Sequence, residues 1–489
     1  MTMTRRMHIQ EEAARCLLCE DAPCTAACGS GDPARAVRAV RFGNAAQAGR
    51  WVASCSEADL EAAEQACIHY DRPVRLRELF ALLPEAPAAA PAFPLGIDFC
   101  GIRCENPFFL ASSAVCTNYE MVASAFEAGW AGVFYKTLCI QDIDEVSPRF
   151  DAVKRPDGSF AGFRNMEQLS ENPLEEDLDI LHRLKVNYPG KVVVASIMGR
   201  TDEQWIRLAK KVEKAGVDAI ELNFSCPQMR LAGMGSDVGQ SMEHVAFYTS
   251  YVKRAVKIPV IAKMTPNVAS MTPVAMAALL GGADGISAIN TIKSVTMGGE
   301  VAGKRIVSGY SGAAVKPIAQ RFILEIAKNP HAQAAQLSGI GGITTWQDAL
   351  EFIQLGCRNV QICTAVMEYG YRIIDDLVAG LQAYLVQRGV ASLEDIVGEA
   401  LDQFVRVSDL DRQSFVFPTV DRSLCIGCGR CYVSCRDGGH QAITFGADRV
   451  PRVVGTRCVG CHLCLLVCPS GAIGTARRIP KRAASPHKV

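Results

Sequence analysis

The feature that most constrains the fold is a run of four cysteines that occurs twice near the C-terminus. The two runs are Cys425, Cys428, Cys431, Cys435 and Cys458, Cys461, Cys464, Cys468, with identical separations. Three thiolates on one tight loop can hold three corners of a metal–sulfur cubane, while the fourth projects to a second one. The spacing therefore predicts that this part of the chain binds metal.

This spacing is typical of bacterial two-cluster ferredoxins, and it predicts two [4Fe-4S] clusters. The expected ligand sets are Cys425, Cys428 and Cys431 with Cys468, and Cys458, Cys461 and Cys464 with Cys435. Zinc is the alternative because C-x2-C pairs also build zinc ribbons, but two full copies of the run favour iron–sulfur clusters. We expect a ferredoxin domain at residues 418–475, followed by a solvated basic tail at 476–489. Such a domain implies electron transfer to another redox centre.

Length and charge narrow the possible classes of protein. The 489 residues are too many for one hydrophobic core, so we expect two or three domains. The 51 basic and 51 acidic residues cancel, which disfavours nucleic acid or a membrane surface as a partner. No stretch of the sequence suits a signal peptide or a membrane span. We therefore expect a cytoplasmic protein whose clustered cysteines bind metal instead of forming disulfides.

The central part of the chain alternates short apolar runs with segments of helical spacing. An Ala/Pro linker is expected at 82–94, and the alternation continues from 95 to about 395. The expected strands are 107–114, 132–138, 192–198, 219–226, 260–265, 285–290, 336–342 and 359–365. Eight such units favour a closed (β/α)8 TIM barrel over a doubly wound sheet, whose first strand would need a G-x-G-x-x-G motif. The fold class is α/β, with a second linker at 396–417.

Polar residues gather where these expected strands end, and active sites of TIM barrels lie at that end. They are Lys136, Thr137, Asn223, Ser225, Cys226, Lys263, Asn290 and Thr291. Gly341 and Gly342 end the seventh expected strand, and Cys363 and Thr364 end the eighth, where this fold commonly cradles a phosphate. A phosphate cradle with two lysines predicts FMN, because cations beside the ring stabilise the anionic reduced flavin.

Several longer segments resemble a known family. ELNFSCPQM, AKMTPN, GGADGISAINT and GYSGAAVKPIA occur in this order. The motif Asn-x-Ser-Cys-Pro resembles flavin-dependent dihydroorotate dehydrogenases, and the set resembles more closely the pyrimidine-reducing part of dihydropyrimidine dehydrogenases. Over about residues 95–475 the chain is similar to the subunit of the bacterial NAD-dependent enzymes that carries FMN, the substrate site and the clusters. The resemblance implies reduction of the C5=C6 bond of uracil or thymine.

The resemblance also implies a role for each site residue. Cys226 would be the general acid, since a thiol with an ordinary pKa near 8.5 is mostly protonated at pH 7. The pyrimidine would contact Asn165, Asn223, Phe224, Ser225, Asn290 and Thr291, whose amides match the donors and acceptors of uracil. FMN would contact Ser112, Lys136, Thr137, Lys263, Ser311, Gly312, Gly341, Gly342, Cys363 and Thr364. The carboxylates of residues 174–179 are expected on a solvated helix face instead.

The first 81 residues form a separate cysteine-rich segment. The spacing Cys16-x2-Cys19-x4-Cys24-x3-Cys28 is similar to the helical iron–sulfur domain of the long dihydropyrimidine dehydrogenases. By spacing, Cys67 completes a set with Cys16, Cys19 and Cys24, which predicts one further [4Fe-4S] cluster. Cys28 and Cys55 are too few for another cluster. A zinc site, or a docking domain without metal, is the alternative.

No segment carries a nucleotide-binding fingerprint for NAD or FAD. Electrons from NAD(P)H are therefore expected through a partner flavoprotein that holds FAD and NAD(H). A dihydroorotate dehydrogenase-type enzyme acting on orotate or dihydroorotate is the same-fold alternative, and it would need an added cation for the carboxylate. The alternative from another class is a non-catalytic, ferredoxin-type electron carrier with a barrel scaffold.

Overall fold

The computed structural model describes residues 3–69, 71–84, 94–155, 159–229, 232–297, 303–332 and 334–481. The chain divides into two compact units. The larger holds Phe42–Asn44 and Pro87–Gln403, and the smaller holds Met1–Arg41, Ala45–Ala86 and Phe404–Val489. None of the helices in the described ranges combines the length and apolar character needed to span a bilayer.

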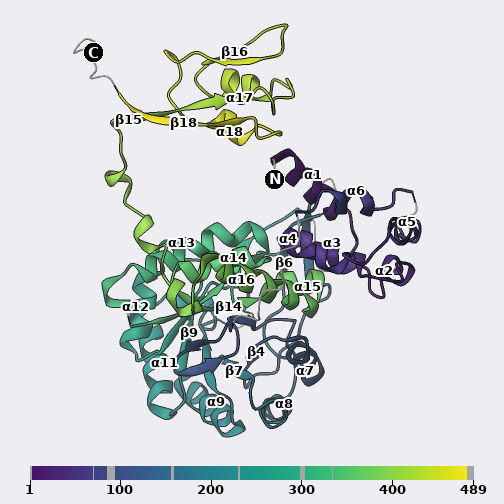
Figure 1. Cartoon of the computed structure of the whole chain (residues 1–489). Helices are drawn as coiled ribbons and strands as arrows, with labels where there is room; N and C mark the ends of the chain where they lie inside the picture. Colours follow the sequence, from purple (N-terminus) through teal and green to yellow (C-terminus); the bar gives the residue numbers. More distant parts are fainter. Residues whose placement is uncertain are drawn as a thin grey trace, which may run out of the picture. The chain divides into compact units, whose positions relative to one another are not determined.

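The larger unit is built on a closed barrel of eight parallel strands (Figure 1). The strand order is β10-β13-β14-β3-β4-β7-β8-β9. The strands are β3 (Phe108–Leu110), β4 (Gly132–Leu138), β7 (Val192–Ile197), β8 (Ala219–Asn223), β9 (Val260–Lys263), β10 (Gly285–Ala288), β13 (Gln336–Ile340) and β14 (Cys357–Ile362). Each overlaps one of the eight predicted runs, so the TIM-barrel prediction is confirmed.

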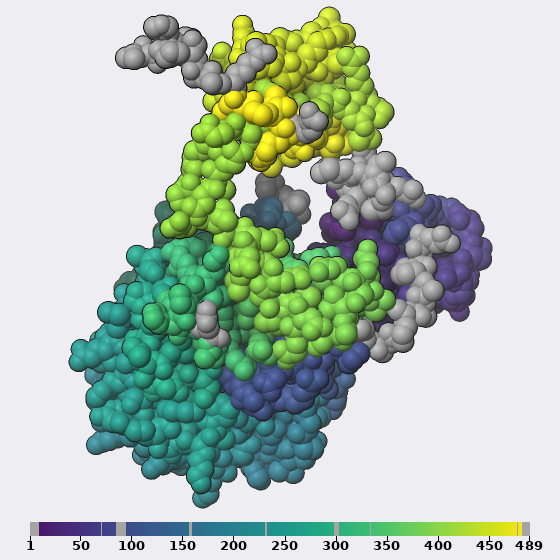
Figure 2. Space-filling model, turned by 60° about the vertical axis from the view of Figure 1, so that its left-hand side comes forward, coloured from purple at the N-terminus to yellow at the C-terminus, as the bar shows by residue number. Residues whose placement is uncertain are grey.

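Helices cover the outside of the barrel (Figure 1), and Figure 2 shows the outer surface that the side chains of this unit form. They are α7 (Tyr119–Ala128), α8 (Leu174–Asn187), α9 (Asp202–Ala215), α10 (Ser236–Gly239), α11 (Met242–Ala255), α12 (Thr272–Leu280), α13 (Lys316–Ala327), α14 (Trp346–Gln354), α15 (Thr364–Tyr369) and α16 (Ile374–Arg388). Helix α9 begins after Thr201, whose side chain accepts from the Gln204 N–H, and ends at left-handed Gly216. Because helices cover their outer faces, β4, β7 and β8 are buried along their whole length.

An additional four-stranded sheet, which the sequence did not predict, is formed by two insertions in the barrel unit. Its order is β11-β12-β6-β5, and all of its pairs are antiparallel. The strands are β5 (Phe150–Lys154), β6 (Phe160–Asn165), β11 (Ile292–Ser294) and β12 (Ser308–Ser311). A short antiparallel hairpin, β1 (Ile97–Phe99) and β2 (Ile102–Cys104), precedes the barrel. The sheet joins the segment after β4 to the segment after β10.

The N-terminal part of the smaller unit is helical. Its elements are α1 (Met3–Ala14), α2 (Pro23–Ala27), α3 (Pro33–Arg41), α4 (Ala45–Ala48), α5 (Glu57–Gln65) and α6 (Leu76–Ala81). Its core is small and aliphatic, with Val37, Val40 and Leu79 nearly inaccessible. Cys16, Cys24 and Cys67 pack against this core. Most of the predicted Ala/Pro linker, residues 85–93, lies outside the described residues.

In its described residues, the C-terminal part of the smaller unit forms two short sheets, two α-helices and a 3-10 turn at Val407–Asp409. Its elements are β15 (Ser414–Val420), α17 (Arg430–Gly438), β16 (Ile443–Phe445), β17 (Pro451–Val453), α18 (Leu463–Leu466) and β18 (Ile473–Pro480). Strands β15 and β18 pair antiparallel from Ser414 with Pro480 to Val420 with Ile473. The ladder therefore extends beyond both ends of the expected range 418–475, into the expected linker and the expected tail. Residues 482–489 of the tail are not described.

Candidate functional site

A cavity of about 280 Å³ lies where the barrel strands end. It is lined by residues that directly follow β3, β10, β13 and β14, together with side chains of the additional sheet. The residues predicted for FMN or substrate that line it are Ser112, Asn165, Lys263, Asn290, Thr291, Ser311, Gly312, Gly341, Gly342, Cys363 and Thr364. The barrel thus brings together residues that are far apart in the sequence, at the end where this fold carries active sites.

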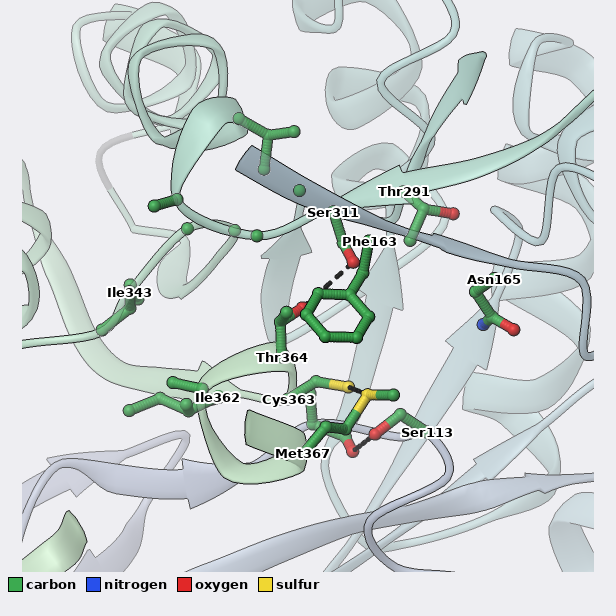
Figure 3. Close-up of a pocket in the computed structure, with 18 of the residues that line it drawn as sticks. Ser113, Phe163, Asn165, Thr291, Ser311, Ile343, Ile362, Cys363, Thr364 and Met367 are labelled. Atoms are coloured by element: carbon green, nitrogen blue, oxygen red, sulfur yellow. Dashed lines mark hydrogen bonds between the residues drawn. The ribbon is translucent and has the colours of Figure 1, made fainter. Parts of the chain in front are cut away.

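The additional sheet supplies one wall of the cavity, as Figure 3 shows for Phe163 and Asn165. Phe150, Phe160 and Tyr310 come from the same sheet. These aromatic residues give the cavity a wide apolar surface beside its polar groups, as is usual for sites that bind a planar cofactor. Sequence reasoning missed this wall, although Arg155-Pro-Asp-Gly158 is a turn signal between two short runs.

Small polar and glycine residues form another part of the lining. Ser311 Oγ and Thr364 Oγ1 are 3.0 Å apart, and Figure 3 shows this hydrogen bond. Gly342 has a φ of +77°, and a Cβ built there would lie 2.7 Å from the backbone nitrogen of Lys316, the first residue of α13. Only glycine fits such a close approach without strain. The backbone of the loop that follows β13 therefore passes close to the start of α13.

A buried hydrogen-bonded network joins the cavity to the Asn-x-Ser-Cys-Pro segment. Asn290 Nδ2 donates to Ser225 Oγ at 2.9 Å, and Ser225 Oγ donates to Asn223 Oδ1 at 2.7 Å. Asn223 Nδ2 then donates to Thr137 Oγ1 at 2.9 Å, which is 3.1 Å from Ser112 Oγ. Each side chain is oriented by its neighbours, so the network presents fixed donors and acceptors at the cavity edge.

Both predicted flavin lysines are buried and each is paired with a glutamate. Lys136 Nζ lies 2.8 Å from Glu167 Oε2, and Lys263 Nζ lies 3.4 Å from Glu221 Oε1. Lys263 lines the cavity, whereas Lys136 reaches Glu167 beside it. Sequence reasoning missed both glutamates, although Glu221 lies in the segment ELNFSCPQM and Glu167 comes two residues after Asn165. In each of these two buried ion pairs, the negative charge of the glutamate offsets part of the positive charge of the lysine.

Cys226 is 5% exposed, lies three residues after the end of β8, and is not among the residues that line the main cavity. Burial raises the pKa of its thiol to about 11, although the nearby charges of Lys136 and Lys263 act to lower it. A thiol with this pKa carries its proton throughout the neutral range. The Cys226 carbonyl accepts a hydrogen bond from the Ser236 N–H at 2.9 Å, so the following loop folds back onto it.

A partly buried acidic residue that sequence reasoning did not identify also acts on Cys226. Glu145 accepts a hydrogen bond from the Gln168 N–H at 2.6 Å, and its second oxygen is buried without a hydrogen bond. Burial raises the pKa of Glu145, and its charge contributes to the raised pKa of Cys226.

Two sequence expectations do not match the structure in detail. The Phe224 ring is fully buried and packs against Trp205 of α9, 5.3 Å between ring centres, so it faces the helix layer. A substrate contact by Phe224 therefore stays a prediction, and the direction of its ring does not support that prediction. Asp177, expected on a solvated face, is 1% exposed and accepts a hydrogen bond from Tyr135 Oη at 2.9 Å. Its helix α8 turns that residue towards β4.

The eight cysteines of the two C-terminal runs surround two separate small cavities. One is lined by Cys425, Cys428, Cys431 and Cys468, and the other by Cys435, Cys458, Cys461 and Cys464. These are the two ligand sets expected from the spacing. Burial raises the pKa of Cys464 to about 11, and the neighbouring thiolates Cys461 and Cys435 add to this shift. Such mutual repulsion between thiolates is relieved when they share a cationic metal centre.

The N-terminal segment contains a third cavity of the same kind. Cys16, Cys19, Cys24 and Cys67 all line it, and Leu17, Val37 and His69 are among its other residues. Burial raises the pKa of Cys24 to about 11, with further contributions from the charges of the other three thiols. The remaining two cysteines lie apart from this cavity and contact each other, with 3.0 Å between Cys28 Sγ and Cys55 Sγ.

Comparison with known proteins identifies both of the larger domains. The family model described as dihydroorotate dehydrogenase matches residues 95–385, which is more than half of the chain. The chain belongs to this family. A second model, described as a 4Fe-4S dicluster domain, matches residues 418–474. The family assignment covers the whole barrel, and the dicluster match covers both four-cysteine runs.

Individual relatives extend these matches. The NAD-dependent dihydropyrimidine dehydrogenase subunit PreA of Escherichia coli strain K12 is 52% identical over 357 residues, 71% of this chain and 87% of the relative. The chloroplastic dihydropyrimidine dehydrogenase (NADP(+)) of Arabidopsis thaliana is 37% identical over 336 residues, 65% of this chain and 79% of the relative. The catalytic subunit of dihydroorotate dehydrogenase B (NAD(+)) of Pyrococcus horikoshii is 37% identical over 315 residues, 63% of this chain and 98% of the relative.

Proposed function

We propose that the chain is the catalytic subunit of a dihydropyrimidine dehydrogenase. It would bind FMN in the barrel cavity and reduce the C5=C6 bond of uracil or thymine. The observation that carries this proposal is the buried network of Asn290, Ser225 and Asn223, which runs from the cavity to the segment that holds Cys226. Because Ser225 directly precedes Cys226, this segment combines amide and hydroxyl groups with a protonated thiol, the combination that recognition and protonation of a neutral pyrimidine need.

FMN is supported by the chemistry of the lining. Lys263 is a buried cation at the cavity wall, aromatic residues offer a planar apolar face, and Gly341 and Gly342 leave backbone accessible near Thr364. FMN would be held by these residues together with Ser112, Ser311, Gly312 and Cys363. When bound, FMN supplies a hydride to one carbon of the pyrimidine double bond.

The protein side chains supply the proton and the orientation. Cys226 holds its proton on Sγ and would donate it to the second carbon of the double bond. The raised pKa keeps this thiol protonated at neutral pH. Asn165, Asn290 and Thr291 line the cavity and would orient the ring. Asn223 and Ser225 would act indirectly, because their hydrogen bonds fix the position of Asn290.

Charge balance favours a neutral pyrimidine over orotate. Orotate carries a carboxylate and would need a free cation in the site, but both buried lysines are already paired with glutamates. Arg155 also lines the cavity, but it is exposed, so solvent screens its charge, and its side chain donates to Ser159 Oγ and the Phe160 carbonyl. We therefore assign uracil or thymine as the substrate class.

The deciding experiment reduces the purified chain anaerobically with dithionite and then adds uracil, thymine, orotate or buffer alone. We expect uracil or thymine to reoxidise the flavin, as seen in its visible absorbance, whereas orotate and buffer leave it reduced. Faster reoxidation by orotate would replace the proposal with a dihydroorotate dehydrogenase-type activity. A chain without flavin absorbance would instead support the electron-carrier alternative.

We further propose that electrons reach FMN from NAD(P)H through a partner flavoprotein and the iron–sulfur clusters. The support is twofold. The sequence lacks an NAD or FAD fingerprint, and the E. coli relative is itself named as a subunit of an NAD-dependent enzyme. The two C-terminal sets of four thiols suit one [4Fe-4S] cluster each. A cytoplasmic location stays a prediction.

A third [4Fe-4S] cluster is proposed for Cys16, Cys19, Cys24 and Cys67, because these four thiols line one cavity. The purified chain should then contain about twelve irons, and Cys24→Ser should lower this to about eight. Iron and acid-labile sulfide analysis measures both values. Cys55→Ser is the matched control, since Cys55 lies outside this cavity, and it should keep the full iron content. Equal iron content in Cys24→Ser and the unmodified chain would rule out the third cluster.

A further inference from the structure

Glu221 is a buried carboxylate that the proposed reaction does not itself use. It lies in β8, has no exposed surface, and is 3.4 Å from Lys263 in the neighbouring strand β9. Lys263 lines the cavity, whereas Glu221 is not among the residues that line it. Glu221 can therefore act on a bound cofactor only through Lys263 or through its electric field.

The groups around Glu221 leave Lys263 as the main partner of its negative charge. Its Oε1 accepts a hydrogen bond from Ser196 Oγ at 3.0 Å, while its Oε2 is buried and has no hydrogen-bond partner. Ser196 is itself held by Thr137, 2.9 Å away. A buried carboxylate with one unsatisfied oxygen is poorly stabilised by hydrogen bonds alone, so its main stabilising partner is the ammonium group of Lys263.

We propose that Glu221 sets the reduction potential of the bound flavin by partly neutralising Lys263. This inference rests on the proposed function, because it requires FMN in the cavity. An ammonium beside the flavin favours the anionic reduced form and so raises the potential. A carboxylate paired with that ammonium in a low-dielectric interior opposes this effect. Glu221 thus keeps the reduced flavin a stronger hydride donor than Lys263 alone would allow.

This role differs from that of Glu167, the glutamate beside Lys136. Glu167 is also paired with Arg149, 3.4 Å away, so its charge is shared between two cations. Glu221 has one cation within ion-pair distance in the described residues. Glu221 is therefore a positioning and charge-balancing residue, and its effect should be visible in the flavin potential rather than in substrate binding.

The test is an anaerobic redox titration of the flavin in the full-length, cofactor-loaded chain, with no pyrimidine present. Glu221→Gln retains the size of the side chain and an acceptor for Ser196 but removes the charge. We expect the ratio of reduced to oxidised flavin at a fixed potential to rise at least about tenfold, which equals about 30 mV for a two-electron couple. Lys263→Gln, the second variant, should shift the potential in the opposite direction.

Asp177→Asn is the matched control, because Asp177 is also a buried carboxylate of the barrel unit but bonds to Tyr135 and Asn172. Its flavin potential should equal that of the unmodified chain. An unchanged potential in Glu221→Gln, or shifts of the same sign in Glu221→Gln and Lys263→Gln, would overturn the inference while leaving the proposed function intact. A chain that binds no flavin would overturn the proposed function first and this inference with it.

Discussion

Replacing Cys226 by alanine should lower the rate at which uracil reoxidises the reduced flavin by about 10²- to 10⁴-fold, the range expected for loss of a general acid. The reason is that a proton must reach the pyrimidine as the hydride does, and Cys226 is the protonated group that directly follows Ser225 of the buried network. The measurement is single-turnover absorbance of the flavin after mixing with uracil. Flavin and iron contents should stay unchanged, because Cys226 lines neither the main cavity nor a cysteine cavity.

The matched control is Cys104→Ala. Cys104 is also buried, at 1% exposure, and burial raises its pKa to about 12, but it lies in the β1–β2 hairpin outside the site. The Cys104→Ala variant should reduce uracil at the unmodified rate. The rate of Cys226→Ser should lie between the rates of Cys226→Ala and the unmodified chain, since a hydroxyl can donate a hydrogen bond but yields its proton less readily than a thiol. Normal turnover by Cys226→Ala would remove Cys226 from the mechanism.

The barrel could be predicted because its strands carry an unusually direct signal. Strands buried on both faces show continuous apolar runs, and β4 and β7 are buried at every residue. Three cysteines of each C-terminal cavity were also predictable, since they follow one another at short, regular spacing within one segment. For the strands and for these groups of three the information is local, whereas the fourth cysteine of each cavity comes from the other run and was expected only from the ferredoxin pattern.

The parts that were missed depend on contacts between distant segments. Tyr310 of β12 pairs with Arg164 of β6, and neither strand has an apolar run of its own. The additional sheet and its aromatic wall therefore become visible only when the barrel brings these insertions together. The glutamate partners of the lysines also depend on contacts between distant segments. The sequence shows that Glu221 is a charged residue within the apolar run AIELN, but its pairing with Lys263 arises only because β9 lies beside β8.

The second large effect should come from Cys464→Ala in the ferredoxin domain. Cys464 is 6% exposed and lines one cavity with Cys435, Cys458 and Cys461, so its loss leaves three thiols for a cluster that takes four. Pyrimidine reduction driven by NAD(P)H and a partner flavoprotein should fall below about a hundredth of the unmodified rate, because the proposed electron route is broken. Steady-state turnover of the reconstituted complex measures this.

The same variant separates electron delivery from chemistry, because the barrel and the ferredoxin domain fall in different compact units. Flavin that has been reduced directly by dithionite should still be reoxidised by uracil at nearly the unmodified rate. Leu466→Ala is the control, since Leu466 lies in the same helix α18 but is 77% exposed, and it should keep both activities. If Cys464→Ala retained turnover with the partner, electrons would enter the barrel by a route that does not use this cluster. If it also lost the dithionite-driven reaction, the cluster would be needed for the flavin site itself.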